Sequence, residues 1–178
     1  MYAASKRLLD LHVRSLLPTA PSPVVGVRYF NVYGPQEGHK GPMASVAFHL
    51  FHQLRRTGVM QLFEGSRDLR RDFVHVADVV AVTLALRDLG ASGLFNCGTG
   101  QARSFLDVAG CLRALEGGRG EIAFIPFPEA LRGQYQAHTE ADLTRLRAAG
   151  CDHAFLSLEE GMRQYHVALT RSGGYLER

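Results

Sequence analysis

The segment Val24-Val25-Gly26-Val27-Arg28-Tyr29-Phe30, followed at once by Asn31-Val32-Tyr33-Gly34-Pro35, decides the fold class. The first of these two stretches is short, apolar and β-branched at its start, which is typical of a strand buried in a parallel sheet. The second stretch predicts a turn at the carboxyl end of that strand. Ligands of open α/β sheets bind at the carboxyl ends of the strands, so we expect binding residues in this turn.

The residues before this strand predict a helix over 2–17. Apolar side chains recur there at helical spacing, and the proline-containing segment 18–23 ends the pattern. Tyr2 and Lys6 stand four residues apart, so they share one face of the helix. An ordinary tyrosine titrates near about 10, and a cation within about 4–6 Å stabilises its phenolate and lowers that pKa towards neutrality. This pair is the first candidate for proton transfer.

After the strand, further strands and helices alternate along the chain. This alternation predicts an α/β fold with crossover connections. We expect helices from Pro42 to about Thr57, over 78–89, over 106–115 behind the N-cap Ser104, and over roughly 139–149 and 157–170. We expect strands over 60–63, 72–76, 93–97 and 121–127.

Composition describes an ordinary globular chain. Hydrophobic residues make up 46% and charged residues 21% of the 178 residues, which suits one domain or two interleaved lobes. A net charge of +3 and a pI of about 8.9 give no sign of a nucleic-acid partner. The 3 cysteines have no metal-ligand spacing, and no apolar run approaches the length of a membrane span. We therefore expect a cytoplasmic protein with no metal and no membrane partner.

Lysine is nearly absent from this chain. Lysine and arginine total 20, yet Lys6 and Lys40 are the only lysines. Arginine stays charged at any relevant pH, whereas a lysine amine can be tuned to exchange a proton. These two lysines are therefore candidates for chemistry, and retention by chance is the alternative interpretation.

Four motifs occur in a specific order: the Tyr2-x-x-x-Lys6 helix, RYFNVYGP at 28–35, RDFVHVADVV at 71–80 and FNCGTG at 95–100. In this order they resemble the C-terminal part of the extended short-chain dehydrogenase/reductase family, the nucleotide-sugar epimerases and dehydratases. The resemblance implies an α/β fold made of a partial Rossmann parallel sheet and a smaller mixed α/β substrate domain. It places residues 1–40 and 72–100 in the cofactor domain and residues 41–71 and 101–178 in the substrate domain.

Three segments are similar to one branch of this family, the ADP-glycero-manno-heptose 6-epimerases. They are residues 28–50, 62–79 and 125–150, and the likeness as a whole runs from Tyr2 to about Gly161. It implies an isomerase that inverts C6 of ADP-heptose through NADP-dependent oxidation to a ketone and re-reduction, for lipopolysaccharide heptose precursors. It also implies a homo-oligomer, a homopentamer. Another nucleotide-sugar epimerase or dehydratase is the alternative.

The resemblance assigns catalytic roles to three residues. Tyr2 matches the tyrosine base, and Lys40 matches the lysine that serves as the second base. Lys6 matches the partner that lowers the tyrosine pKa and binds the nicotinamide ribose. The cofactor contacts implied are Lys6, Val32 and Lys40. Both lysines of this lysine-poor chain therefore fall on catalytic positions.

The resemblance also implies a set of substrate contacts, spread over four parts of the chain. At one of them, Pro42, the family usually has a serine, and a proline has no hydroxyl to donate. Taken alone, a histidine, arginine or glutamate at these positions would more often be an ordinary helix or surface residue. The implied contacts are Asn31, Pro42, His49, Phe63, Glu64, Gly65, Ser66, Arg71 and Tyr135.

Several other residues are better read as structural. We expect Asp72 and Asp78 to hold local structure and Cys97 to be a small buried hydrophobe. Gly98 and Gly100 are expected to be turn glycines.

No Gly-x-x-Gly-x-x-Gly turn occurs in the sequence, although such a turn holds the cofactor pyrophosphate in this family. We expect the chain to correspond to the C-terminal half of an enzyme and to be inactive by itself. A non-catalytic module that binds sugar nucleotides or supports assembly is the alternative.

Overall fold

The computed structural model of the protein describes residues 2–131, 133 and 135–175. Its helices are α1 (Tyr2–Leu16), η1 (Gly38–Met43), α2 (Val46–Thr57), α3 (Val76–Asp88), α4 (Phe105–Leu115), η2 (Glu129–Leu131), α5 (Thr144–Ala148) and α6 (Leu158–Ser172). Its strands are β1 (Val25–Tyr29), β2 (Asn31–Tyr33), β3 (Val59–Phe63), β4 (Arg70–His75), β5 (Gly93–Cys97), β6 (Ala102–Ser104), β7 (Glu121–Ile125) and β8 (His138–Thr139). The predicted mixed α/β fold is confirmed.

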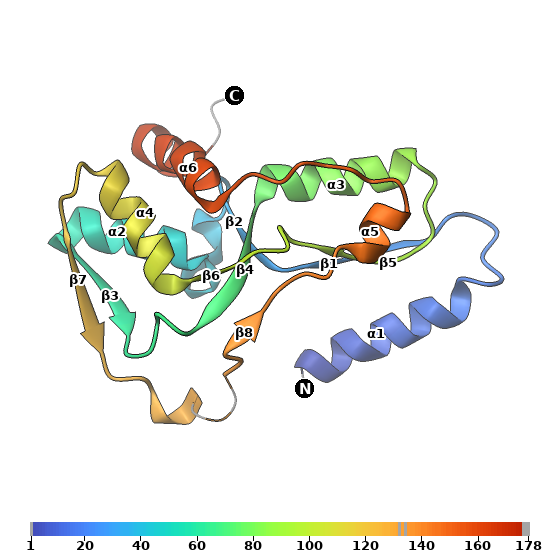
Figure 1. Ribbon diagram of the computed structural model, residues 1–178, viewed down its shortest axis with the longest axis horizontal. Helices are drawn as coiled ribbons and strands as arrows, with labels where there is room; N and C mark the ends of the chain where they lie inside the picture. The colour runs from blue at the N-terminus through green and yellow to red at the C-terminus, as the bar shows by residue number, and fades with distance from the viewer. Residues whose placement is uncertain (1, 132, 134, 176–178) are drawn as a thin grey trace.

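The elements gather at two ends of an elongated molecule. Figure 1 shows α3, α5, β1 and β5 at one end and α2, α4, β3 and β7 at the other, with β4 between them. β3 and β7 form a parallel pair. β4 pairs antiparallel with β6 and parallel with β8. β4 also pairs in parallel with β2, so the strand that joins the two ends has partners from three different parts of the chain.

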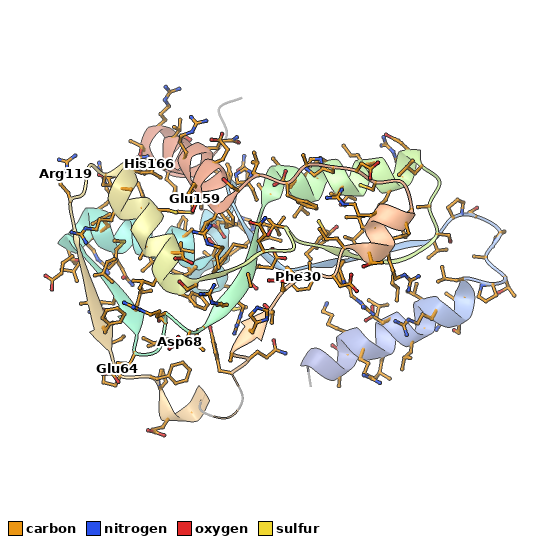
Figure 2. The ribbon with its side chains drawn as sticks, in the orientation of Figure 1. Phe30, Glu64, Asp68, Arg119, Glu159 and His166 are labelled. Carbon is orange, nitrogen blue, oxygen red and sulfur yellow. The ribbon has the colours of Figure 1, made fainter. Side chains whose placement is uncertain are left out.

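The chain changes sheets at Phe30. β1 pairs in parallel with β5, with Val25 opposite Gly93 and Tyr29 opposite Cys97. β2 then pairs in parallel with β4. Between them, the Phe30 N–H donates to the Cys97 carbonyl at 3.0 Å, and Phe30 lies near the middle of the molecule (Figure 2). Segment 31–33 was expected to be a turn, and it is a strand because pairing with β4 uses its backbone groups.

The predicted beginning of α2 at Pro42 is wrong. Pro42 lies in η1, and α2 begins at Val46 because the Ser45 side chain accepts the Phe48 N–H. The predicted end at Thr57 is confirmed, with Gly58 in the left-handed conformation at φ 74°. Ser104 caps α4 as expected, in a reciprocal pair with Asp107.

The helix predicted over 139–149 shrinks to α5, residues Thr144–Ala148. The Ala141 N–H donates to Asp72 across the fold, at 3.0 Å. The Asp142 carboxylate accepts the Thr144 N–H at 2.9 Å. Both bonds hold the backbone in non-helical geometry, so the helix begins only after them.

Two hydrophobic clusters form the core, one at each end of the molecule. The first joins α2, α4 and α6 to β3 and β4, and the second joins α3, α5 and β5 to β4. The first cluster includes Leu50, Phe51, Met60, Phe73, Leu112, Met162 and Tyr165. The second includes Val74, Val82, Leu86, Phe95, Cys97, Leu146 and Cys151.

α1 lies at the margin of the molecule, beside β1 and β5 (Figure 1). An ion pair of 2.7 Å joins Asp10 of α1 to Arg28 of β1. Leu8 and Leu9 are 66% and 56% exposed, so the apolar residues of α1 are only partly covered. No helix in the described part of the chain has the length and apolar character to cross a membrane.

Candidate active site

The segment from Gly38 to Met43 forms a short 3₁₀ turn that carries Lys40. The Lys40 side chain is 43% exposed, and its Nζ lies 3.9 Å from Glu37 Oε2. Gly41 has φ 53° and ψ −126°, a conformation that favours glycine. The turn therefore presents the second candidate base on a defined backbone at the surface.

Two other predicted substrate residues meet beside this turn. His49 lies on the first turns of α2, and its Nε2 is 3.3 Å from the Pro42 carbonyl oxygen. Because a carbonyl can only accept, this bond requires a proton on His49 Nε2. The structure thus places Lys40 and Pro42 on the 3₁₀ turn, with His49 of the following helix against Pro42.

The second group of predicted residues surrounds a cavity of about 370 Å³ at the end of β3. Glu64, Gly65 and Tyr135 line it, together with Asp68, Leu69, Phe127 and Gly133. Figure 2 shows Glu64 and Asp68 in the lower half of the molecule, on the side of the β3–β7 pair.

Aromatic rings form one wall of this cavity. Phe127 lies edge-to-face with Phe63 and with Tyr135, each at 5.5 Å between ring centres. The sequence prediction missed Phe127. The sequence did offer a sign of it. Phe127 follows the strand β7, which pairs in parallel with β3, so both strands end at the same edge, with Phe63 opposite Ile125.

Arg71 is buried, with 7% exposure, and is not the solvated surface charge expected of an isolated arginine. Its guanidinium carbon lies 4.7 Å from the Tyr135 ring centre and 5.8 Å from that of Phe105. One N–H donates to the Arg70 carbonyl at 2.7 Å. A guanidinium has five N–H donors in a planar fork, so donors remain for phosphate oxygens.

Ser66 serves the turn that precedes β4. It is 3% exposed, and its hydroxyl donates to the Phe63 carbonyl at 2.5 Å. Gly65 has φ 80°, and a Cβ built on it would meet nothing within 4 Å. Gly65 is therefore required by backbone conformation, and its open face adjoins the cavity.

The remaining predicted residues lie on α1 and β2. Asn31 is exposed and Val32 half-buried, opposite Phe73 and Val74 of β4. Lys6 lies on α1, which contacts β5. The Tyr2 side chain is outside the described part of the structure, so the predicted Tyr2–Lys6 pairing is not observed here.

Asp72 holds the turn after β5, as expected. It is fully buried and accepts from Thr99 N at 2.7 Å, Gly100 N at 2.8 Å and Ala141 N at 3.0 Å. A Cβ built on Gly98 would lie 2.6 Å from Asp72 Oδ2, so this position admits only glycine. The bonds confirm a structural role for this aspartate and for the turn glycines.

Asp78 and Cys97 are also structural, as expected. Asp78 accepts the Leu156 N–H at 3.1 Å and lies 2.8 Å from His153 Nε2. Burial raises the pKa of the Cys97 thiol to about 12, so it stays protonated. Cys97 behaves as a small apolar side chain.

Comparison with known proteins identifies the family. The sequence pattern of the NAD dependent epimerase/dehydratase family matches residues 1–98, more than half of the chain. The chain belongs to this family. Members of this epimerase/dehydratase family are NAD(P)-dependent enzymes that act on nucleotide sugars, and the α/β fold with parallel strand pairs described above agrees with their Rossmann-like architecture.

Solved structures of several members resemble this family member over nearly its whole length. The ADP-L-glycero-D-manno-heptose-6-epimerase of Helicobacter pylori is 30% identical, with 96% of this chain and 51% of that chain covered and a TM-score of 0.83. An NAD dependent NDP-hexosamine 5,6-dehydratase of tunicamycin biosynthesis is also 30% identical, with 96% and 53% covered and a TM-score of 0.76.

A third member, the UDP-glucose 4-epimerase of Thermotoga maritima with bound UDP-glucose, is 25% identical. The match covers 96% of this chain and 53% of the epimerase, with a TM-score of 0.81. The chain thus spans about half the length of the family members it matches.

Val32, the β2 residue predicted to contact the family's dinucleotide, lies just after Phe30, where the chain switches strand partners from β5 to β4. Asn31 and Val32 follow this switch directly. A pyrophosphate would need a glycine-rich turn before a helix N-terminus, and the sequence holds no Gly-x-x-Gly-x-x-Gly turn. The sequence therefore contains no recognisable site for the pyrophosphate of the dinucleotide.

Proposed function

We propose that this chain supplies the substrate-binding part of an ADP-heptose 6-epimerase, with Tyr2 and Lys40 as the two proton-transferring residues. The observation that carries the proposal is the cavity at the end of β3: Phe127 and Tyr135 line it, and the buried Arg71 guanidinium lies 4.7 Å from the Tyr135 ring centre. The 30% identity and TM-score of 0.83 with the Helicobacter pylori heptose epimerase support it.

The cavity suits the ADP half of such a substrate. Phe63, Phe127 and Tyr135 offer ring faces and edges against which a nucleobase stacks, and stacking on an aromatic side chain is worth about 1–3 kcal/mol per base. Arg71 is fixed beside Tyr135, so its remaining donors reach diphosphate oxygens without loss of side-chain freedom. Adenine and diphosphate would thus be held at one end of the molecule.

Inverting a secondary alcohol needs a proton acceptor on each face of the carbon, because the two epimers present their hydroxyls from opposite sides. Tyr2 would take the proton from one epimer, with Lys6 stabilising its phenolate. Lys40, on the exposed 3₁₀ turn, would exchange the proton of the other. The dinucleotide, when bound, supplies the hydride acceptor and donor. His49 beside Pro42 would orient the sugar.

Nucleotide binding tests the proposal. We expect the chain to bind ADP and ADP-ribose in calorimetry, and Phe127→Ala to weaken ADP binding about tenfold, since one stacking contact is lost. Phe124→Ala is the matched control, because Phe124 lies on the neighbouring strand but is 52% exposed and lines no part of this cavity. It should leave ADP binding unchanged.

The choice of nucleotide separates the alternatives. Binding of UDP equal to or tighter than that of ADP would contradict the ADP-heptose assignment and favour a UDP-sugar epimerase or another dehydratase. If Phe127→Ala binds ADP as tightly as the wild type, the cavity at the end of β3 is not the binding site of the nucleotide.

A further inference from the structure

Glu37 is an anionic side chain buried where the Lys40 turn begins. It is 2% exposed, although a buried carboxylate is stable only when hydrogen-bond donors satisfy it. Three donors converge on it. Ser45 Oγ at 2.6 Å and Tyr165 OH at 2.8 Å donate to Oε1, and the Ser45 N–H at 2.7 Å donates to Oε2.

These bonds hold both ends of the turn. The Glu37 carbonyl accepts the Lys40 N–H at 2.9 Å, at the beginning of the turn. Its carboxylate binds Ser45, which follows the turn and caps α2. The side chain of one residue thus closes a loop of seven residues, 38–44.

Another contact to the turn is that of His49 Nε2 with the Pro42 carbonyl, at 3.3 Å. No residue from Gly38 to Met43 is buried, and Met43 is 84% exposed. Tyr165, by contrast, is fully buried in the core on α6. Burial is the main cause that raises the pKa of Tyr165 far above its usual value, and the Glu37 carboxylate raises it further. The Tyr165 hydroxyl therefore keeps its proton and remains a donor. Glu37 therefore connects an exposed turn to a rigid helix.

We infer that Glu37 is the positioning residue for Lys40: it fixes the 38–44 turn against α6 and so sets where the lysine amine lies. This inference rests on the proposed role of Lys40. Only a group with several acceptor sites meets three donors at once, which a carboxylate does and an alanine cannot.

Hydrogen exchange of backbone amides tests the inference in the chain itself. In Glu37→Ala, exchange at Lys40 and Ala44 should accelerate about tenfold to a hundredfold, because hydrogen bonds to a charged group are lost and the turn opens locally. These two amides bond to main-chain carbonyls, so any change reports the turn and not a lost side-chain acceptor. Amides of the β3–β7 pair should keep their wild-type rates.

Two further variants sharpen the comparison. Glu37→Gln keeps an acceptor for Ser45 Oγ and Tyr165 OH but sets an amide donor opposite the Ser45 N–H, so it should restore only part of the protection. Tyr165→Phe removes one donor but keeps the core ring, so it should give an intermediate acceleration even if Glu37→Ala fails to fold. Asp78→Ala is the matched control, because Asp78 is also buried, at 4% exposure, but its carboxylate bonds to His153 and Leu156 and, within the described residues, makes no hydrogen bond to the 38–44 turn.

The amine itself gives a second readout, since Lys6 and Lys40 are the only lysines. Trace acetylation followed by mass spectrometry yields a Lys40 to Lys6 labelling ratio. We expect Glu37→Ala to raise that ratio about twofold or more, because an amine on a loosened turn meets the reagent more often. Asp78→Ala should leave it unchanged.

Neither readout requires epimerisation, so a failure of the proposed function and a failure of this inference are distinguishable. Unchanged exchange at Lys40 and Ala44 in both Glu37→Ala and Tyr165→Phe would overturn the inference. An equal loss of protection throughout the chain, with an unchanged labelling ratio, would also overturn it, since Glu37 would then serve general stability alone.

Discussion

At the scale of single residues, three buried carboxylates hold together segments that are far apart in the sequence. Asp72, Asp78 and Glu37 are each less than 5% exposed, and each accepts hydrogen bonds from segments distant in the sequence. Removing one partner of such a group leaves the rest unsatisfied, which costs about 1–3 kcal/mol or more. These carboxylates therefore hold loops that hydrophobic contact alone would leave free.

His75 is a buried polar side chain that, in the described part of the chain, has one ring nitrogen unsatisfied. It is 4% exposed and caps α3, with Nδ1 accepting the Ala77 N–H at 3.3 Å. Within the described residues, its Nε2 is buried without a hydrogen-bond partner. Burial lowers the pKa of His75, although the Asp78 carboxylate opposes the shift. The neutral ring is thus the form that the fold stabilises.

This shift predicts a pH dependence of stability. As pH falls through about 6.5, the unfolded chain takes a proton on this histidine while the folded chain resists it. The free energy of unfolding should therefore be highest above that pH and fall between pH 7.5 and 5.5. His75→Asn, which keeps a capping oxygen, should reduce the slope. Urea unfolding followed by circular dichroism measures both, since the chain has no tryptophan.

His52 provides the comparison for this experiment, because burial and His49 also lower its pKa. His52→Gln removes that contribution separately. A His75→Asn variant with the same slope as wild type would show that His75 is not responsible.

At the scale of elements, α1 and β1 are the least covered parts of the fold. Among the described residues β1 pairs only with β5, which leaves its other edge without a strand. On α1, Leu8, Leu9 and Leu11 are 66%, 56% and 49% exposed. An open strand edge next to an apolar helix face is a surface that associates with other chains.

We therefore expect the purified chain to self-associate. Light scattering after gel filtration should give a mass above that of one chain, and Leu8→Gln with Leu9→Gln should shift it towards the monomer. Leu84→Gln is the control, since Leu84 is 44% exposed on α3 and should leave the mass unchanged. A wild-type chain that is monodisperse, monomeric and melts cooperatively would contradict this expectation.

At the scale of the whole molecule, the predicted substrate-binding features are more complete than the predicted cofactor-binding ones. The cavity at the end of β3 and the Lys40 turn are both formed, whereas the sequence holds no glycine-rich turn for a dinucleotide pyrophosphate. The chain spans about half the length of the family members it matches, 51% of the Helicobacter pylori enzyme.

We expect the chain, purified by itself, to retain neither NADP nor NAD and to leave ADP-heptose unchanged. The physical reason is the lack of a glycine-rich turn to hold the pyrophosphate. Mass spectrometry of the denatured protein's supernatant measures retained dinucleotide, with the full-length Helicobacter pylori epimerase as the positive control. Stoichiometric dinucleotide in the chain's own preparation would contradict the prediction.

The sequence by itself determined the order and type of most helices and strands. Apolar periodicity, the Ser104 cap and Gly58 specify them locally, within a few residues of each position. The four motifs of the sequence analysis also predicted the family, because they occur in the order in which the family's fold uses them.

Long-range contacts, seen only in the folded molecule, set where α2 begins, bury the Arg71 guanidinium beside Tyr135, and bring Phe127 to the cavity and Glu37 to Tyr165. Each depends on a partner remote in the chain: Tyr165, which binds Glu37, is 128 residues away. Such contacts form when whole helices and strands pack together, and no pattern in the local sequence reveals them. Local signals therefore fix elements, while long-range packing fixes what their side chains do.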